Sequence, residues 1–287
     1  MKQFLLSILL VIQVAQVSAQ PSTEIMLFDL KISGDNITAT NGSNITRHPG
    51  AYDNQPFFHP EKSLLYYASA DENGHTDIKV YDLNTRQTSY LRQTPEREYS
   101  PTVTPDKKYV SCIIQRDNGA QDLGKYPIDG GDAVVILNHL TVGYHAWVDN
   151  QTLFMFVLGE PITLRQYDLV SKKDTVRATN IGRSLHRIPG SDAVSFIQKT
   201  NDDHWTINRI DRQGNISLIG DALRGREDVA WTPNGHIIIS DGKTLLAMRP
   251  GKTTWKEISI SSPVFLKSVS RLAVSADGTK LALVIEE

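Results

Sequence analysis

The sequence contains a single cysteine, Cys112, among 287 residues. One thiol excludes an internal disulfide and a cysteine-rich zinc site. An excess of charge of one sign is also missing, because 30 Lys and Arg residues stand against 32 Asp and Glu residues, a formal net charge of −2. A nucleic-acid groove needs a strong basic excess to neutralise phosphates, so this composition argues against nucleic-acid binding.

Long apolar runs are missing outside the N-terminus, which excludes a protein with several membrane spans. The N-terminus itself has Lys2, an apolar stretch from Phe4 to Val17, and the small residue Ala19. This pattern predicts a secretory signal peptide over residues 1–19. A membrane anchor is the alternative, but the apolar stretch is shorter than the roughly 20 residues that a spanning helix needs. A secreted chain with one unpaired cysteine suits a bacterial periplasm, so we expect a periplasmic or secreted protein without a membrane span after signal removal.

The rest of the chain is built from a repeated unit. Each unit has a short apolar strand, a turn, and a second strand rich in β-branched and aromatic residues. Six such turns align at Pro60, Pro105, Asp149, Pro189, Pro233 and Ala276, with spacings of 45, 44, 40, 44 and 43 residues. A period of roughly 40–45 residues with several short strands per unit is typical of a β-propeller blade. A helical array of similar period would need a long 3.6-residue apolar periodicity, which the units lack.

The two chain ends each contain part of a unit. An aromatic or apolar residue followed by Asp recurs near the third strand of a unit, as in Tyr81-Asp82 and Tyr167-Asp168, and the pair Phe28-Asp29 repeats it ahead of the first turn. The final unit, in contrast, stops after two strands. We therefore expect residues 24–41 to supply the outer two strands of a last blade whose inner two strands come from residues 269–287. Such closure removes exposed sheet edges.

The expected fold is all-β, a six-bladed β-propeller formed as one domain by residues 20–287. Its predicted blades are about 50–95, 96–140, 141–181, 182–224, 225–262, and 263–287 together with 24–41.

The strings QPFFHPEKSLLYYAS, YSPTVTPDKKYVS and VSADGTKLAL make the repeat similar to the TolB-like, WD40-like propeller repeat known as PD40. The resemblance covers roughly residues 50–287, although the turns at Asp149 and Pro189 depart from its Pro-Asp-Gly pattern. It implies a six-bladed propeller and a periplasmic setting. It is a resemblance to the propeller domain of TolB without the family's extra N-terminal α/β domain, for which the short segment before the first repeat leaves no room. Fold alone does not fix function.

The sequence offers little chemistry for catalysis. No G-x-S-x-G nucleophile motif occurs, and Cys112 lies in an apolar run that predicts a buried structural thiol. The motif H-E-x-x-H is also missing. We therefore expect no catalytic residues and no cofactor, and we predict that the protein is not an enzyme.

Two histidines are the best candidates for a metal site, because some TolB-like propeller lyases hold a metal with histidines from several inner strands. His145 and His186 stand four and three residues before their turns. An offset of one residue places side chains on opposite faces of a strand, so we expect them not to converge and predict no metal site. The segment from Asp71 to Asp77 is faintly similar to a calcium loop, but it lacks the distal bidentate Glu and is predicted to be a hairpin turn.

The segments just before each inner strand are expected to surround one mouth of the central channel. They are rich in Tyr, Arg and carboxylates, and Tyr and Arg are enriched in protein-recognition hot spots. The predicted rim consists of Tyr52, Asp53, Arg97, Glu98, Tyr99, Tyr144, Arg183, Arg226, Asp228 and Arg271. Arg183, Arg226 and Arg271 come from consecutive blades and are predicted to form a fork for a carboxylate or phosphate. The alternative is that opposite charges pair with each other around a wet channel.

Two hypotheses for function follow. The leading one is an exported, non-catalytic scaffold that binds a protein or peptide of the cell envelope through its loop rim, with a small anion as a further possible ligand. The competing one is a metal-dependent lyase or hydrolase, or a propeller that binds a small anion or saccharide. An enzyme of that kind should direct at least three His, Asp or Glu side chains to one point in the channel.

Overall fold

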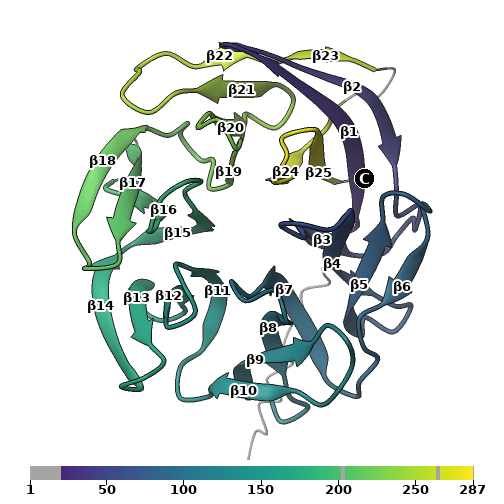
Figure 1. Cartoon of the computed structure of the whole chain (residues 1–287), viewed down its shortest axis with the longest axis vertical. Coiled ribbons are helices and arrows are strands. Elements are labelled where there is room, and N and C mark those ends of the chain that lie inside the picture. The colour runs from purple at the N-terminus through teal and green to yellow at the C-terminus, as the bar shows by residue number, and fades with distance from the viewer. Residues whose placement is uncertain (1–20, 202–203, 263–265, 287) are drawn as a thin grey trace, which may run out of the picture.

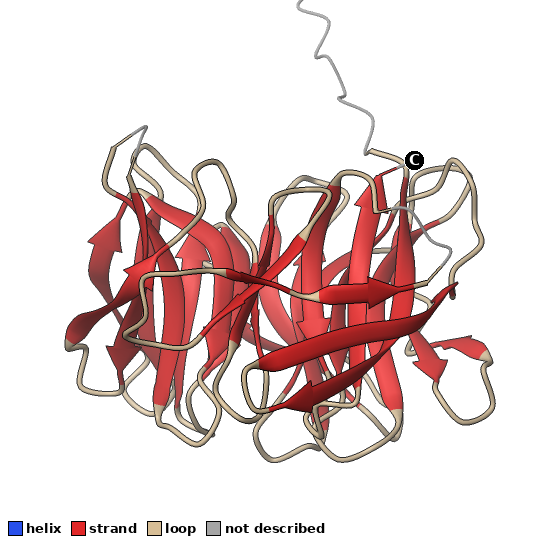
Figure 2. Cartoon of the chain, turned by 90° about the horizontal axis from the view of Figure 1, so that it is seen from above, coloured by secondary structure: helices blue, strands red, loops and turns tan. Residues whose placement is uncertain are grey.

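The computed structural model describes residues 21–201, 204–262 and 266–286, and the predicted signal peptide lies outside these ranges. The described residues form six β-sheets arranged in a ring around a central axis (Figure 1). Seen from the side, the ring is a short cylinder whose two faces consist of the loops between strands (Figure 2). None of the helical structure that would be needed to cross a bilayer is present in the described ranges.

Blades one to three are four-stranded sheets in chain order, with the first strand of each innermost. Blade one is β3(Asp53–Phe58), β4(Leu64–Ala70), β5(Thr76–Asp82) and β6(Thr88–Tyr90). Blade two is β7(Arg97–Val103), β8(Tyr109–Gln115), β9(Gln121–Pro127) and β10(Val134–Leu137). Blade three is β11(Val142–Trp147), β12(Thr152–Val157), β13(Thr163–Asp168) and β14(Lys173–Thr179).

Blades four and five follow the same pattern. Blade four is β15(Ile181–Arg187), β16(Ala193–Lys199), β17(Trp205–Asp211) and β18(Ile216–Asp221). Blade five is β19(Val229–Trp231), β20(Ile237–Ser240), β21(Leu245–Met248) and β22(Lys256–Glu257).

Blade six joins the two ends of the chain. Its strands are β24(Val269–Val274), β25(Lys280–Glu286), β1(Thr23–Ser33) and β2(Asn36–Asn44), and the short β23(Ser259–Ser261) pairs in parallel with β2 at the outer edge. The antiparallel pairing of β1 with β25 runs from Thr23 opposite Glu286 to Asp29 opposite Lys280. The predicted six-bladed propeller, closed by N- and C-terminal strands, is confirmed.

The apolar core lies between the blades. Six clusters of buried side chains each join neighbouring sheets, for example Trp147 and Met155 of blade three with Ile113 and Leu123 of blade two. Because both faces of a blade are covered, its second strand is largely apolar, and all six residues of β12 are buried. This two-sided burial explains why the sequence shows continuous apolar runs instead of a strict alternation.

The turns that define the repeat are held by a short polar side chain. In blade two the Thr104 hydroxyl donates to Asp106, whose carboxylate also accepts from the backbone N–H of Lys108. Blade five repeats this arrangement with Thr232 and Asn234. Lys107 occupies the left-handed position, φ 60°, where the turns of blades five and six have Gly235 and Gly278, so the departure from Pro-Asp-Gly keeps the turn geometry.

A bulge interrupts the inner strands of most blades. The register shifts between Asn54 and Phe57 in β3 and between Tyr99 and Thr102 in β7, with similar shifts in β11, β15 and β24. Gln55 and Ser100 adopt left-handed φ values of 58° and 55° at the first two of these shifts. A bulge adds one residue to a strand and re-aims the side chains on one side of it. Residues before the bulge therefore do not follow the alternation counted back from the turn.

Candidate functional site

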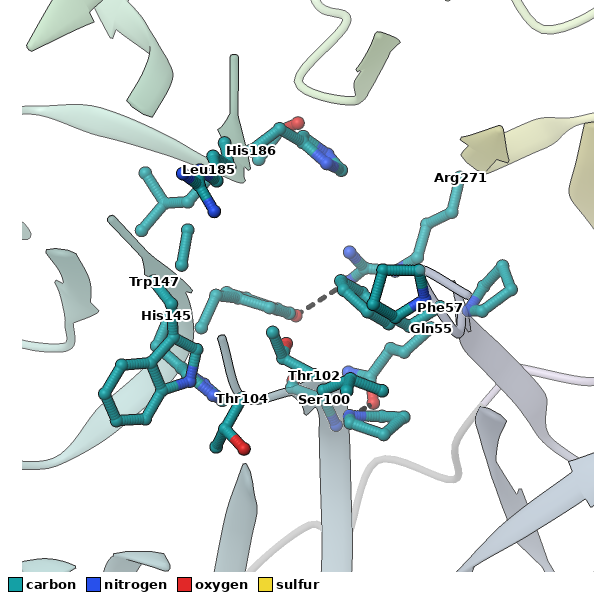
Figure 3. A pocket seen from close by; sticks show the side chains of 18 of the residues that line it. Gln55, Phe57, Ser100, Thr102, Thr104, His145, Trp147, Leu185, His186 and Arg271 are labelled. Atoms are coloured by element: carbon teal, nitrogen blue, oxygen red, sulfur yellow. Dashed lines mark hydrogen bonds between the residues drawn. The ribbon is translucent and has the colours of Figure 1, made fainter. Parts of the chain in front are cut away.

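A cavity of about 250 Å³ lies on the propeller axis, lined by inner strands of the blades. Figure 3 shows His186 and Leu185 of β15, Arg271 of β24 and Phe57 of β3 around it. Its walls are largely apolar and include Trp147. Toward one end the lining reaches the repeat turns, at Pro60, Pro105 and Lys107. The other end is bounded by charged side chains.

These charged side chains form a layer across the channel, contributed by four consecutive blades. Arg271 donates from Nη1 to Oδ1 of Asp228 at 3.2 Å and from Nη2 to the hydroxyl of Tyr144 at 2.7 Å. Arg183 donates from Nε and Nη2 to Oδ2 of Asp228 at 3.1 and 2.9 Å. One carboxylate thus receives both arginines, and each of its oxygens is used. We call Tyr144, Arg183, Asp228 and Arg271 the channel layer.

Two of the three arginines of the predicted fork, Arg183 and Arg271, come together in the channel layer. The carboxylate of Asp228 occupies the position between Arg183 and Arg271 that the sequence analysis assigned to an external anion. The side chain of Asp228 is only 11% exposed and that of Arg271 13%, whereas Arg183 is 36% exposed. Arg271 is therefore committed to the protein, and Arg183 keeps surface that a bound molecule can touch.

Electrostatics in the cavity favour a neutral His186. Burial lowers the pKa of His186 to about 4, with Asp228 opposing the shift and Arg271 adding to it. The wall of the cavity at this height therefore carries an uncharged imidazole at neutral pH. The imidazole supplies hydrogen-bonding groups and adds no positive charge to those of Arg183 and Arg271.

The second candidate histidine, His145, lines the same cavity as His186, but its imidazole is bonded in the seam between blades two and three. His145 is buried, and its Nε2 lies 2.7 Å from Oγ of Ser111, which also accepts a hydrogen bond from Nε1 of Trp147 at 2.8 Å. Burial lowers the pKa of His145 to about 3. Trp231 and Ser195 repeat the tryptophan–serine bond between blades four and five. His145 thus bonds to the serine of a tryptophan–serine pair that the fold uses twice.

Metal-ligating side chains are dispersed over the part of the chain that the structure describes. Within it, no three His, Cys, Asp or Glu side chains are arranged to hold an ion. Cys112 is fully buried, and burial raises the pKa of its thiol well above the usual range.

Two predicted tyrosines lie near the channel layer. Tyr52 is half-buried; burial raises the pKa of its hydroxyl, and the nearby Arg271 partly opposes that shift. Tyr99 is also half-buried and accepts a hydrogen bond from the hydroxyl of Thr76 in blade one at 3.3 Å. Tyr52 therefore lies near Arg271, whereas the hydroxyl of Tyr99 reaches the third strand of blade one.

The other predicted rim residues lie elsewhere. Arg97 is 3.8 Å from the exposed Asp117. Arg226 rests against Gly242, where a Cβ would come within 2.7 Å of its Nη2. It lines a polar cavity of about 310 Å³ whose walls also include Arg183 and Asp228. Asp53 and Glu98 are each only 1% exposed. Of these four residues, only Arg226 therefore shares a cavity with members of the channel layer.

Glu98 lies inside blade two, and it forms no ion pair with another described residue. Its Oε1 accepts hydrogen bonds from the hydroxyls of Thr94 at 2.6 Å and Tyr126 at 2.9 Å, and its Oε2 is buried without a partner. Burial raises the pKa of Glu98 to about 7, although these two hydrogen bonds oppose the shift. Burial also raises the pKa of the Asp53 carboxyl. Its Oδ2 has no hydrogen-bond partner but lies 3.8 Å from Nδ1 of His48.

Sequence reasoning did not select the apolar wall of the cavity. The positions three and four residues before the aligned turn residue line the cavity in four blades, for example Phe57 and Pro56 in blade one. This regular offset was readable in the repeat and would have identified the wall. The pairing of both arginines with Asp228 had no comparable signal.

No protein-family model matches the chain, and no curated protein matches it in sequence. Solved structures do match. An Agrobacterium tumefaciens protein assigned as a TolB superposes with a TM-score of 0.72 at 13% identity, over 94% of this chain and 99% of that one. TolB from Acinetobacter baumannii gives 0.58 at 12% identity over 92% of this chain, which spans 64% of that longer protein.

An oligogalacturonate lyase in complex with manganese is also similar, with a TM-score of 0.55 at 15% identity over 91% of this chain and 78% of that one. At such low identities these similarities establish the fold and carry no residue correspondence. The chain is a six-bladed propeller of TolB-like architecture.

Proposed function

We propose that this protein is an exported, non-catalytic scaffold that binds a protein or peptide of the cell envelope at its propeller channel. The observation that carries the proposal is the channel itself, a largely apolar cavity of about 250 Å³ that ends on the polar channel layer. That volume is below the usual range of roughly 300–1,000 Å³ for small-molecule sites. A cavity of this size suits a few side chains of a polypeptide better than an oligosaccharide.

The chemistry of the lining supports a peptide ligand. Phe57, Trp147 and Leu185 offer apolar and aromatic surface, and the exposed part of Arg183 offers donors for a carbonyl or carboxylate. Aromatic residues and Arg dominate binding energy in protein interfaces. The similar TolB structures add support from fold, and the N-terminal pattern supports export to the periplasm.

Site-specific photo-crosslinking in producing cells tests this proposal. A photoreactive residue replaces Arg187, which is exposed and lines the cavity, or, as a matched control, Val170, which is 72% exposed outside the cavity. We expect a discrete crosslinked protein from position 187 and none from position 170. Adding Arg183→Ala should reduce the yield at position 187. Equal crosslinking from both positions, or none from position 187, would contradict the proposal.

A further inference from the structure

A third cavity, of about 630 Å³, lies away from the axis where blade six meets blade one. Its walls come from β1, from the end of β2 and the segment that follows it, and from the β5–β6 hairpin, which lie side by side in Figure 1. This volume is within the usual range for small-molecule sites, roughly 300–1,000 Å³. The cavity uses none of the residues of the channel layer.

The charged residues of this cavity are unbalanced. Arg47, Arg86 and Lys280 line it together with a single carboxylate, Asp29. Asp29 is occupied, because it accepts a hydrogen bond from the Asn41 amide at 2.7 Å and is ion-paired with Lys280. Those two contacts, Asn41 first, lower the pKa of Asp29, so it remains ionised.

Unlike Lys280, Arg47 and Arg86 are not ion-paired with a carboxylate of a described residue. The Nε of Arg47 donates to a backbone carbonyl, that of Asn44, at 3.3 Å. Arg86 is exposed, and its charge also helps to lower the pKa of Asp29, so the two groups lie near each other. No carboxylate ion pair joins either arginine to another described residue. Three cations and one carboxylate leave a local charge of about +2 in a chain whose formal net charge is −2.

We call the cavity lined by Arg47, Arg86, Lys280 and Asp29 the cationic groove. We propose that it is a binding site for a small molecule that carries at least two negative charges, as carboxylate or phosphate groups. Guanidinium and ammonium groups bind both kinds of anion by charge-assisted hydrogen bonds. Ser43 and Asn44 add neutral polar groups at the edge, and Tyr81 provides an aromatic surface for the body of the ligand. The proposal is independent of partner binding at the channel.

Isothermal titration with inorganic pyrophosphate and with citrate, at fixed ionic strength, tests the site. The two probes distinguish a phosphate ligand from a carboxylate ligand. We expect saturable binding of at least one of them by the natural protein, and a loss of affinity of about tenfold or more in Arg86→Ala, since a charge-assisted bond contributes about that much.

The chain offers a matched control for Arg86. Lys172 occupies the equivalent turn of blade three, is exposed, and has a φ of 57° where Arg86 has 59°. Lys172→Ala should bind the probe as the natural protein does. Absence of saturable binding of both probes, or equal losses in Arg86→Ala and Lys172→Ala, would overturn the proposal.

Asp29→Asn tests the same site in the opposite direction. Removing the carboxylate raises the local charge and frees Lys280, so the affinity for the bound probe should rise severalfold. A gain of affinity is not a result that misfolding can produce. Weaker binding in Asp29→Asn would contradict a site defined by its excess of positive charge.

Discussion

The channel and the cationic groove are both lined by arginines, yet they differ in one respect. In the channel, Asp228 lies between Arg183 and Arg271 and receives hydrogen bonds from both. In the groove, the only carboxylate is held by Lys280 and Asn41, and Arg47 and Arg86 remain without one. A shared carboxylate turns an arginine pair into part of the structure, whereas its absence leaves the charge available to a ligand. Residue type alone does not distinguish these two cases.

The largest expected effect is on the channel layer. Asp228→Asn removes the charge that compensates Arg271, which is only 13% exposed, and should lower the free energy of unfolding by about 3 kcal/mol. Urea unfolding measures this change. In the groove, Arg86→Ala should alter the free energy of unfolding by less than about 0.5 kcal/mol, because an exposed side chain is removed. Equal changes in the free energy of unfolding for Asp228→Asn and Arg86→Ala would contradict the difference between the channel and the groove.

Glu98 extends the comparison to a buried carboxylate that has no ion pair with a described residue. Its pKa in the folded protein, about 7, lies above the usual value of 4.5, so the folded state binds more protons than the unfolded state between those two values. Stability from this group is therefore present at low pH and is lost as pH rises from about 4.5 to about 7, by roughly 2–3 kcal/mol.

The test is the difference in unfolding free energy between the natural protein and Glu98→Gln, measured across this pH range. The variant keeps a neutral side chain at every pH and should lack that part of the slope. A natural protein and variant with parallel pH profiles would show that Glu98 does not titrate as burial requires.

Salt should separate the two arginine regions further. Screening acts strongly on exposed charges and weakly on buried ones. Raising the ionic strength should therefore weaken anion binding in the groove severalfold. It should leave the destabilisation caused by Asp228→Asn nearly unchanged, because Asp228 is 11% exposed. Anion binding that is insensitive to salt would indicate a site other than the exposed groove.

The smallest expected effect concerns metals. His145 is bonded to Ser111, and the described residues contain no cluster that could hold an ion. Manganese or a chelator should therefore move the melting temperature by less than about 1 °C. A saturable rise on adding manganese, lost in His186→Ala, would instead favour a metal-dependent activity in the channel.

The fold was predictable because its signals are local and repeated. Turn residues recur at nearly constant spacing, and the pair Phe28-Asp29 marks β1 as an outer strand that lacks its own inner partners. The blade closed by the two chain ends follows from that pair and from the incomplete final unit. Aspartates at the ends of third strands, such as Asp82, accept hydrogen bonds from the backbone of the next turn, which explains their recurrence.

The site was predictable only in part, because alternation along a strand fails at a bulge. Glu98 precedes the register shift of β7 and turns into blade two, whereas Arg271 follows the shift of β24 and reaches the channel. Gln55 and Ser100 adopt the left-handed backbone conformation, although neither is a residue type that predicts it, as glycine would. The cationic groove could not be predicted for another reason: it is formed by residues far apart in the chain, such as Arg47 and Lys280.

The contrast between the two regions is tested most directly by the arginine Nε–H NMR signals during a titration with pyrophosphate or citrate. The account predicts that the signals of Arg47 and Arg86 shift saturably while those of Arg183 and Arg271 do not, because Asp228 already holds the latter pair. Saturable shifts at Arg183 and Arg271, with no change at Arg47 and Arg86, would contradict it.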